Sequence, residues 1–123
     1  MDTALRLSSS FGGGMGRLRE VCGAAVAMFM IAGLRFGYAD AKDADAKAAH
    51  YRLIQSLGVQ FKARNGSFIC RELLGLPEGA DEPLPSERTK AYYQTRPCAG
   101  LVACAAGMVD ELLQERRAGE EAF

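Results

Sequence analysis

The chain lacks tryptophan and has a single histidine, His50, among its 123 residues. One imidazole disfavours a hydrolase triad, and it excludes zinc or haem sites that draw two or more histidines from one chain. The chain also lacks excess charge, since fifteen lysines and arginines balance fifteen aspartates and glutamates. A balanced charge gives no reason to expect a nucleic acid or an anionic membrane as the partner.

Cysteine is sparse, and no two cysteines form a CxxC pair. Neither a thioredoxin-like motif nor a zinc ribbon is therefore present in the local sequence. Small secreted disulfide domains are usually denser in cysteine. The length predicts one domain over residues 1–123, large enough to bury a core. The four cysteines are Cys22, Cys70, Cys98 and Cys104.

What the sequence does have is a glycine-rich stretch directly before a long apolar segment. Gly12, Gly13 and Gly14 are consecutive, and such glycines allow backbone conformations that are closed to other residues. A helix is predicted over residues 18–36, with Cys22 within about two turns of its start. Helix N-termini and nearby basic side chains stabilise thiolates. The stretch therefore favours thiol or metal chemistry over hydrolysis of a sugar, nucleotide or peptide.

The apolar run over residues 21–34 has two other interpretations, a membrane span and a signal peptide. A membrane span needs roughly 20 apolar residues, and this run is shorter. A signal peptide would have to start at Met15 and be cleaved near Ala39-Asp40-Ala41, which would leave the glycine loop without a role. We therefore interpret the run as a buried helix and expect a cytoplasmic protein without a membrane partner.

Apolar residues recur at helical spacing in the rest of the chain, and no segment shows the alternation of apolar and polar residues that is typical of a strand. A helix that is apolar on all faces is typical of the centre of a bundle, and residues 18–36 have that pattern. The sequence predicts an all-α fold, a compact irregular bundle of about four to five helices around this central apolar helix. The other predicted elements are a helix over 2–10, a turn over 40–45, a helix to about Arg64 stopped by Asn65-Gly66, a short helix capped by Ser67, a turn from Ser86 through Tyr93, a helix from Cys98 to about Arg117, and a disordered end over 118–123.

Cys22, Cys70 and Cys98 each lie close to a predicted helix start. Three helix N-termini that converged would form a pocket suited to thiolates, a metal–sulfur cluster or a reactive disulfide. Alternatively, each cysteine is a small buried hydrophobic residue, as free cysteine often is. Their dispersed spacing does not decide between these two interpretations.

The glycine loop has a second candidate role as an anion site, because backbone amides at a helix N-terminus bind phosphate. Its sequence GGGMG lacks the GK[ST] of a P-loop and the GxGxxG of a dinucleotide-binding fold. We therefore favour a tight loop that packs against another helix.

Four segments in order carry a family resemblance: SSSFGGGMGRLREVCGA, GLRFG, FICRELLG and RPCAGLV. Over roughly residues 2–113 the chain resembles the C_GCAxxG_C_C (CGAxxG) family of redox-active proteins, which is helical, prokaryotic and similar to the N-terminal region of split-Soret cytochromes. The resemblance implies a redox role for the matching cysteines, Cys22, Cys70 and Cys98.

The chain departs from the family pattern at two places. The last glycine of CGAxxG is Ala27 here. The first family cysteine, in an upstream NCAQ-like element, has no counterpart, so that either the start is truncated or misassigned or this member has lost that cysteine. Cys104 is an additional cysteine without a family counterpart.

We expect Cys22, Cys70 and Cys98 to approach one another beside the loop Gly12–Gly14. They would exchange between dithiol and disulfide with an electron-transfer partner, or hold an iron–sulfur cluster or zinc with His50 or Cys104 as the fourth ligand. The alternative is a non-catalytic helical module that dimerises or docks a partner and has inert cysteines. The helix predicted over residues 18–36 is largely apolar and would leave apolar surface exposed to solvent. A second copy of the chain would cover that surface, which favours a homodimer under either interpretation.

Overall fold

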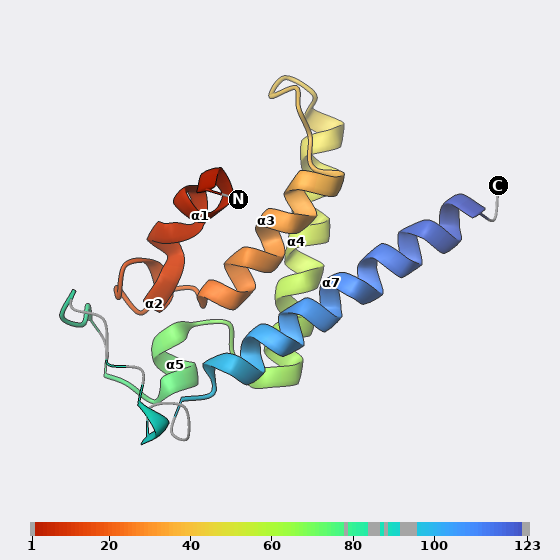
Figure 1. The fold of residues 1–123 in the computed structure, drawn as a ribbon. Helices are drawn as coiled ribbons and strands as arrows, with labels where there is room; N and C mark the ends of the chain where they lie inside the picture. Colours follow the sequence, from red (N-terminus) through yellow and green to blue (C-terminus); the bar gives the residue numbers. More distant parts are fainter. Residues whose placement is uncertain (1, 78, 84–86, 88, 92–95, 122–123) are drawn as a thin grey trace.

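In the computed structural model, the described residues are 2–77, 79–83, 87, 89–91 and 96–121. All regular structure within these ranges is helical, with no strand, which confirms the predicted all-α class (Figure 1). The elements in order are α1 (Asp2–Ser8), the 3₁₀ turn η1 (Ser9–Phe11), α2 (Gly12–Met15), α3 (Gly23–Phe36), α4 (Ala44–Asn65), α5 (Cys70–Leu74) and α7 (Cys98–Glu121).

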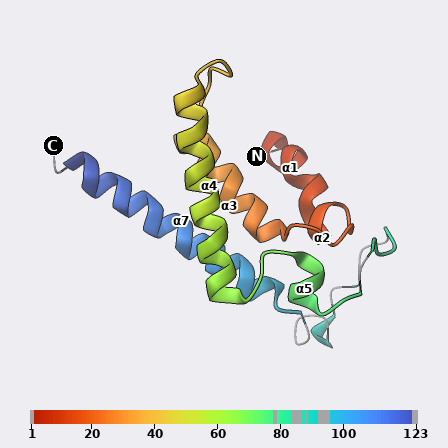
Figure 2. The same cartoon turned by 180° about the vertical axis from the view of Figure 1, so that it is seen from behind.

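Helix α3 is the centre of the packing, as its apolar sequence predicts. It runs beside α4, and α7 crosses both helices (Figures 1 and 2). Small residues allow this close approach, since Ala25 and Ala32 of α3 are almost fully buried. The side chains packed around α3 come from α4 and α7, and they are Leu57, Phe61, Leu101, Ala105, Met108 and Leu112.

The ends of α4 follow the predicted signals. The Asp43 carboxylate accepts a hydrogen bond from the Ala46 amide at 3.0 Å, which caps the start of the helix. Gly66 has a φ of 93° and ends the helix in the left-handed conformation that favours glycine. The turn and stop signals around this helix are therefore confirmed.

Several predicted boundaries are wrong. Helix α3 begins at Gly23, not at residue 18, because the backbone of the preceding residues turns away from a right-handed helix. Helix α7 continues to Glu121, so residues 118–121 are helical where disorder was expected. Ser67 does not cap α5; Ile69 precedes that helix, and the Ser67 hydroxyl accepts a hydrogen bond from the Ile69 amide at 2.9 Å.

The residues that define the predicted turn before the last helix lie outside the described residues. They are Ser86, Tyr92 and Tyr93. Of the helices described, none is long and apolar enough to span a membrane.

The outer face of α3 exposes apolar side chains, and Leu34 is 86% exposed. The homodimer remains a prediction.

The packing of Phe61 generates the first prediction. Its side chain is fully buried between helices, whereas Val59 on the same helix is 67% exposed. We expect Phe61→Ala to lower the free energy of unfolding by about 3–5 kcal/mol, because it leaves a cavity in the core. Val59→Ala is the matched control and should change that free energy by less than about 0.5 kcal/mol. Urea unfolding followed by circular dichroism measures both, and equal losses would contradict the described core.

Candidate functional site

One cavity of about 660 Å³ lies where three helices begin. Cys22 immediately precedes α3, Cys70 is the first residue of α5, and Cys98 is the first residue of α7. All three cysteines line this cavity, and all three are free thiols. In Figure 1 α3 begins beside α2, and α5 and α7 begin below α2. The three helix starts therefore border one cavity, and the approach of the three sulfurs to bonding or ligation distance stays a prediction.

The glycine loop forms the wall of the cavity next to Cys70. Gly13 and Gly14 both have a φ of 68°, so α2 is a left-handed turn, not an ordinary α-helix. The turn continues through Met15, Gly16 and Arg17, which also have positive φ values. A side chain at Gly14 would place its Cβ atom 2.6 Å from the Cβ atom of Cys70. Glycine is therefore required at this position by both conformation and space.

A short antiparallel pairing brings Cys22 close to Cys70. Val21 and Ile69 form an isolated β-bridge. On either side of it, the Cys22 amide donates to the Phe68 carbonyl at 2.8 Å and the Cys70 amide donates to the Glu20 carbonyl at 2.5 Å. In such a pairing Cys22 and Cys70 share one face as diagonal neighbours, about 7–8 Å apart between Cα atoms. The first residues of the helix predicted over residues 18–36 thus form a left-handed turn through Arg19 and then a short extended segment that brings Cys22 close to Cys70.

A buried arginine contacts the sulfur of Cys70. Arg19 is 5% exposed, and its Nη1 atom donates a hydrogen bond to Cys70 Sγ at 3.6 Å. Burial lowers the pKa of Arg19, but the hydrogen bonds to Cys70 and Asp81 outweigh that effect and raise it. The guanidinium is therefore a fixed positive charge beside this sulfur.

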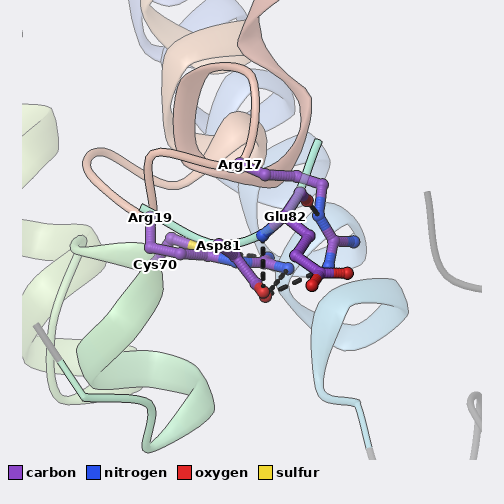
Figure 3. A network of polar contacts seen from close by, with 5 residues as sticks. All are labelled: Arg17, Arg19, Cys70, Asp81 and Glu82. Carbon is purple, nitrogen blue, oxygen red and sulfur yellow. Dashed lines mark hydrogen bonds and ion pairs between the residues drawn. The ribbon is translucent and has the colours of Figure 1, made fainter. Parts of the chain in front are cut away.

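Asp81 holds this arginine in place (Figure 3). One carboxylate oxygen of Asp81 accepts hydrogen bonds from Arg19 Nη2 and Arg17 Nη2, both at 3.0 Å. The Glu82 amide donates to the other oxygen, and that bond and the one from Arg19 lower the pKa of Asp81. The Arg17 Nε atom donates to the Glu82 carbonyl. Sequence reasoning missed this role of Asp81, because nothing distinguishes it from the other acids of EGADEP.

The environment of Cys22 differs from the thiolate-stabilising one expected from sequence. Burial raises the pKa of the Cys22 thiol, and the backbone amides of Ala25 and Ala24 only partly oppose this shift. Negative charge on Cys70 or Cys98 would raise the pKa of Cys22 further. Burial therefore favours the protonated thiol at Cys22, and the basic side chain expected beside Cys22 contacts Cys70 instead.

His50 and Cys104, the expected fourth ligands, do not line the cavity. The ring of His50 packs edge-on against Tyr38 with ring centres 6.2 Å apart. Cys104 Sγ accepts a hydrogen bond from Asn65 Nδ2 at 3.4 Å. Within the described ranges, no three histidine, cysteine, aspartate or glutamate side chains are gathered closely enough to hold a metal ion. The three cysteines thus share a cavity without forming a ready metal site.

The contact between Gly14 and Cys70 generates a stability prediction. Gly14→Ala adds a methyl group against Cys70 and also strains the left-handed backbone, so the expected loss is about 2–5 kcal/mol of unfolding free energy. Gly16→Ala is the matched control, since Gly16 also has a positive φ, of 57°, and its nearest atom lies 4.0 Å from an added Cβ. That control should lose only about 1–2 kcal/mol. Denaturant unfolding of the two variants provides the test, and equal losses would argue against the tight contact.

The raised pKa of Cys22 generates a prediction on alkaline stability. Because the folded chain holds this proton to higher pH than the unfolded chain, the stabilisation is complete below the unfolded pKa, about 8.5, and is lost as pH rises through the folded pKa. We expect the decline in unfolding free energy above about pH 8.5 to become shallower in Cys22→Ala. The decline should persist in Cys104→Ala, which leaves Cys22 intact. Urea unfolding between neutral and alkaline pH measures this effect, and identical profiles in both variants would contradict it.

Comparison with known proteins identifies one family. A family model described as "Putative redox-active protein (C_GCAxxG_C_C)" matches residues 1–112. No curated protein and no solved structure matches the chain. Ala27, which replaces the last glycine of CGAxxG, is exposed on α3 and does not line the cavity. The matched range includes all three cavity cysteines and nearly the whole chain, and the chain therefore belongs to the C_GCAxxG_C_C family.

Proposed function

We propose that the chain is a thiol–disulfide redox protein in which Cys70 and Cys22 are the exchanging pair. One observation carries this proposal: the two cysteines share one face of the paired segments inside the cavity, and a buried arginine contacts one of them. A positive charge beside a sulfur favours the thiolate, which is the nucleophile of disulfide exchange. This asymmetry assigns a separate role to each cysteine.

Cys70 makes the first attack. Its thiolate, held beside Arg19, attacks one sulfur of an incoming disulfide R–S–S–R. The incoming S–S bond breaks, and one R–S⁻ leaves with the electron pair and takes a proton from solvent. The product is a mixed disulfide between Cys70 and the remaining R–S group.

Cys22 completes the exchange. It loses its proton to solvent and attacks the Cys70 sulfur, which expels the second R–S⁻. Two protein thiols are then oxidised to a disulfide, and the incoming disulfide is reduced to two thiols. The raised pKa of Cys22 keeps it protonated during the first step, so it follows Cys70 in order.

The distance between Cys22 and Cys70 determines how far the chain must move to form a disulfide. Disulfides usually join Cα atoms less than about 7 Å apart, whereas diagonal neighbours on paired segments lie about 7–8 Å apart. Bond formation therefore requires residues 19–22 and 68–71 to move closer together. A metal centre would need at least three ligands within coordination range, and the described residues offer no such set. Thiol exchange is accordingly the function we favour over iron–sulfur or zinc ligation.

Equilibration in redox buffers tests the proposal. Protein purified without oxygen should lose two thiols reversibly as the buffer becomes more oxidising, as counted by alkylation and mass spectrometry. Peptide mapping should assign the bond to Cys22 and Cys70. The couple should disappear in Cys22→Ser and in Cys70→Ser. It should remain in Cys104→Ser, the matched control, because Cys104 lies outside the cavity.

Two results would contradict the proposal. Four free thiols in every buffer, with the helical circular dichroism spectrum unchanged, would leave the cysteines as structural residues. Stoichiometric iron or zinc that is lost in Cys22→Ser and Cys70→Ser would make the chain a metalloprotein instead. Metal analysis of the same oxygen-free sample distinguishes these results.

A further inference from the structure

Asp81, Arg19 and Cys70 form one line of contacts, with the arginine between the carboxylate and the sulfur. Arg19 donates from Nη2 to the Asp81 carboxylate at 3.0 Å and from Nη1 to Cys70 Sγ at 3.6 Å. Figure 3 shows the Asp81 carboxylate beside this guanidinium. The Nε atom of Arg19 has no hydrogen-bond partner among the described residues. The two terminal nitrogens of Arg19 therefore fix its guanidinium.

The guanidinium of Arg19 needs both partners to stay where it is. Its residue is 5% exposed. Burial by itself lowers the pKa of Arg19, and the hydrogen bonds to Cys70 and Asp81 reverse that shift. An arginine side chain has many rotamers, and a buried charge that loses a partner is left uncompensated. The carboxylate therefore stabilises the rotamer in which Arg19 contacts the sulfur.

We propose that Asp81 is a positioning residue for Cys70, which holds the Arg19 guanidinium against the sulfur and so maintains the reactivity of that thiol. The proposal rests on the proposed function, in which Cys70 makes the first attack. Asp81 contributes a negative charge as well as a position, and the two have opposite effects. Loss of the charge alone would leave Arg19 more strongly positive and speed the reaction of Cys70, whereas loss of the hold on Arg19 would slow it. The Asp81 side chain is 36% exposed, so solvent screens its charge, and we expect the loss of position to dominate.

Asp81→Asn tests the proposal, because it removes the carboxylate and keeps the backbone contacts of its segment. The Asp81 amide donates to the Arg17 carbonyl at 2.9 Å, and Arg17 Nε donates to the Glu82 carbonyl. Reduced full-length protein is alkylated without oxygen at neutral pH with iodoacetamide, an uncharged reagent, and peptide mass spectrometry follows the rate at each cysteine. We expect modification of Cys70 to slow by about three- to tenfold. Modification of Cys104 should keep its rate, since Cys104 contacts Asn65 outside the cavity.

Three further variants separate position from charge. Asp81→Glu keeps a carboxylate and should recover part of the Cys70 rate. Glu82→Gln is the matched control, because Glu82 joins this network through its backbone amide and carbonyl, and it should leave the rate unchanged. In an Arg19→Gln background, Asp81→Asn should change the Cys70 rate little, because the arginine through which Asp81 acts is gone. If circular dichroism shows that Arg19→Gln does not fold, the comparison of Asp81→Asn with Asp81→Glu decides.

Several results would overturn the proposal. An unchanged Cys70 rate in Asp81→Asn would show that Arg19 stays in place without the carboxylate, and a faster rate would leave Asp81 as an opposing charge only. Equal slowing in Glu82→Gln, or an Asp81→Glu variant as slow as Asp81→Asn, would also contradict a positioning role.

Alkylation needs no disulfide, so it tests Asp81 even if the chain forms no redox couple and the proposed function fails. If the couple of Cys22 and Cys70 is present, Asp81→Asn should raise its equilibrium constant for oxidation severalfold in redox buffers, because a less stabilised thiolate favours the disulfide. An equilibrium constant that stays unchanged while the couple persists would overturn the role of Asp81 and leave the couple standing.

Discussion

The arrangement of the site depends on the pairing of residues 19–22 with residues 68–71. The pairing is possible because the glycine loop turns left-handed and because Gly14 has no side chain to occupy the space of Cys70. It places Cys22 before α3 and Cys70 at the start of α5, on one face of the paired backbone. Without it, the two cysteines would belong to separate helices with no fixed relation. A few backbone hydrogen bonds thus hold the segments that carry Cys22 and Cys70 next to each other at the edge of the helical core.

The two cysteines differ in their surroundings, although both are buried. Arg19, fixed by Asp81, donates a hydrogen bond to Cys70, whereas burial dominates at Cys22 and raises its pKa. In the proposed exchange, this difference favours attack by Cys70 and later resolution by Cys22. Arg19 and Arg17 also line the cavity that holds both sulfurs.

Much of the scaffold follows from the sequence, because its helices have local signals. Apolar spacing, Asp43 and Gly66 predict α4, and the absence of a polar face predicts the central position of α3. Cys22, Cys70 and Cys98 line one cavity, and their closer approach, expected from their places near helix starts and from the family resemblance, stays a prediction. The path of residues 17–22 could not be predicted, since left-handed conformations at Arg17 and Arg19 are rare for such residues and depend on tertiary hydrogen bonds. The contacts of Asp81, about sixty residues from its arginine partners, have no local signal either.

A crystal structure of the oxidised chain would test the central claim most directly. We predict a single disulfide between Cys22 and Cys70, with Gly14 still left-handed and Arg19 still bound to Asp81. Cys104 should remain a free thiol beside Asn65. A disulfide that includes Cys104, or cysteines that open onto separate surfaces of the bundle, would contradict the account. Either contradictory result would show that the pairing of residues 19–22 with 68–71 does not determine the chemistry of this protein.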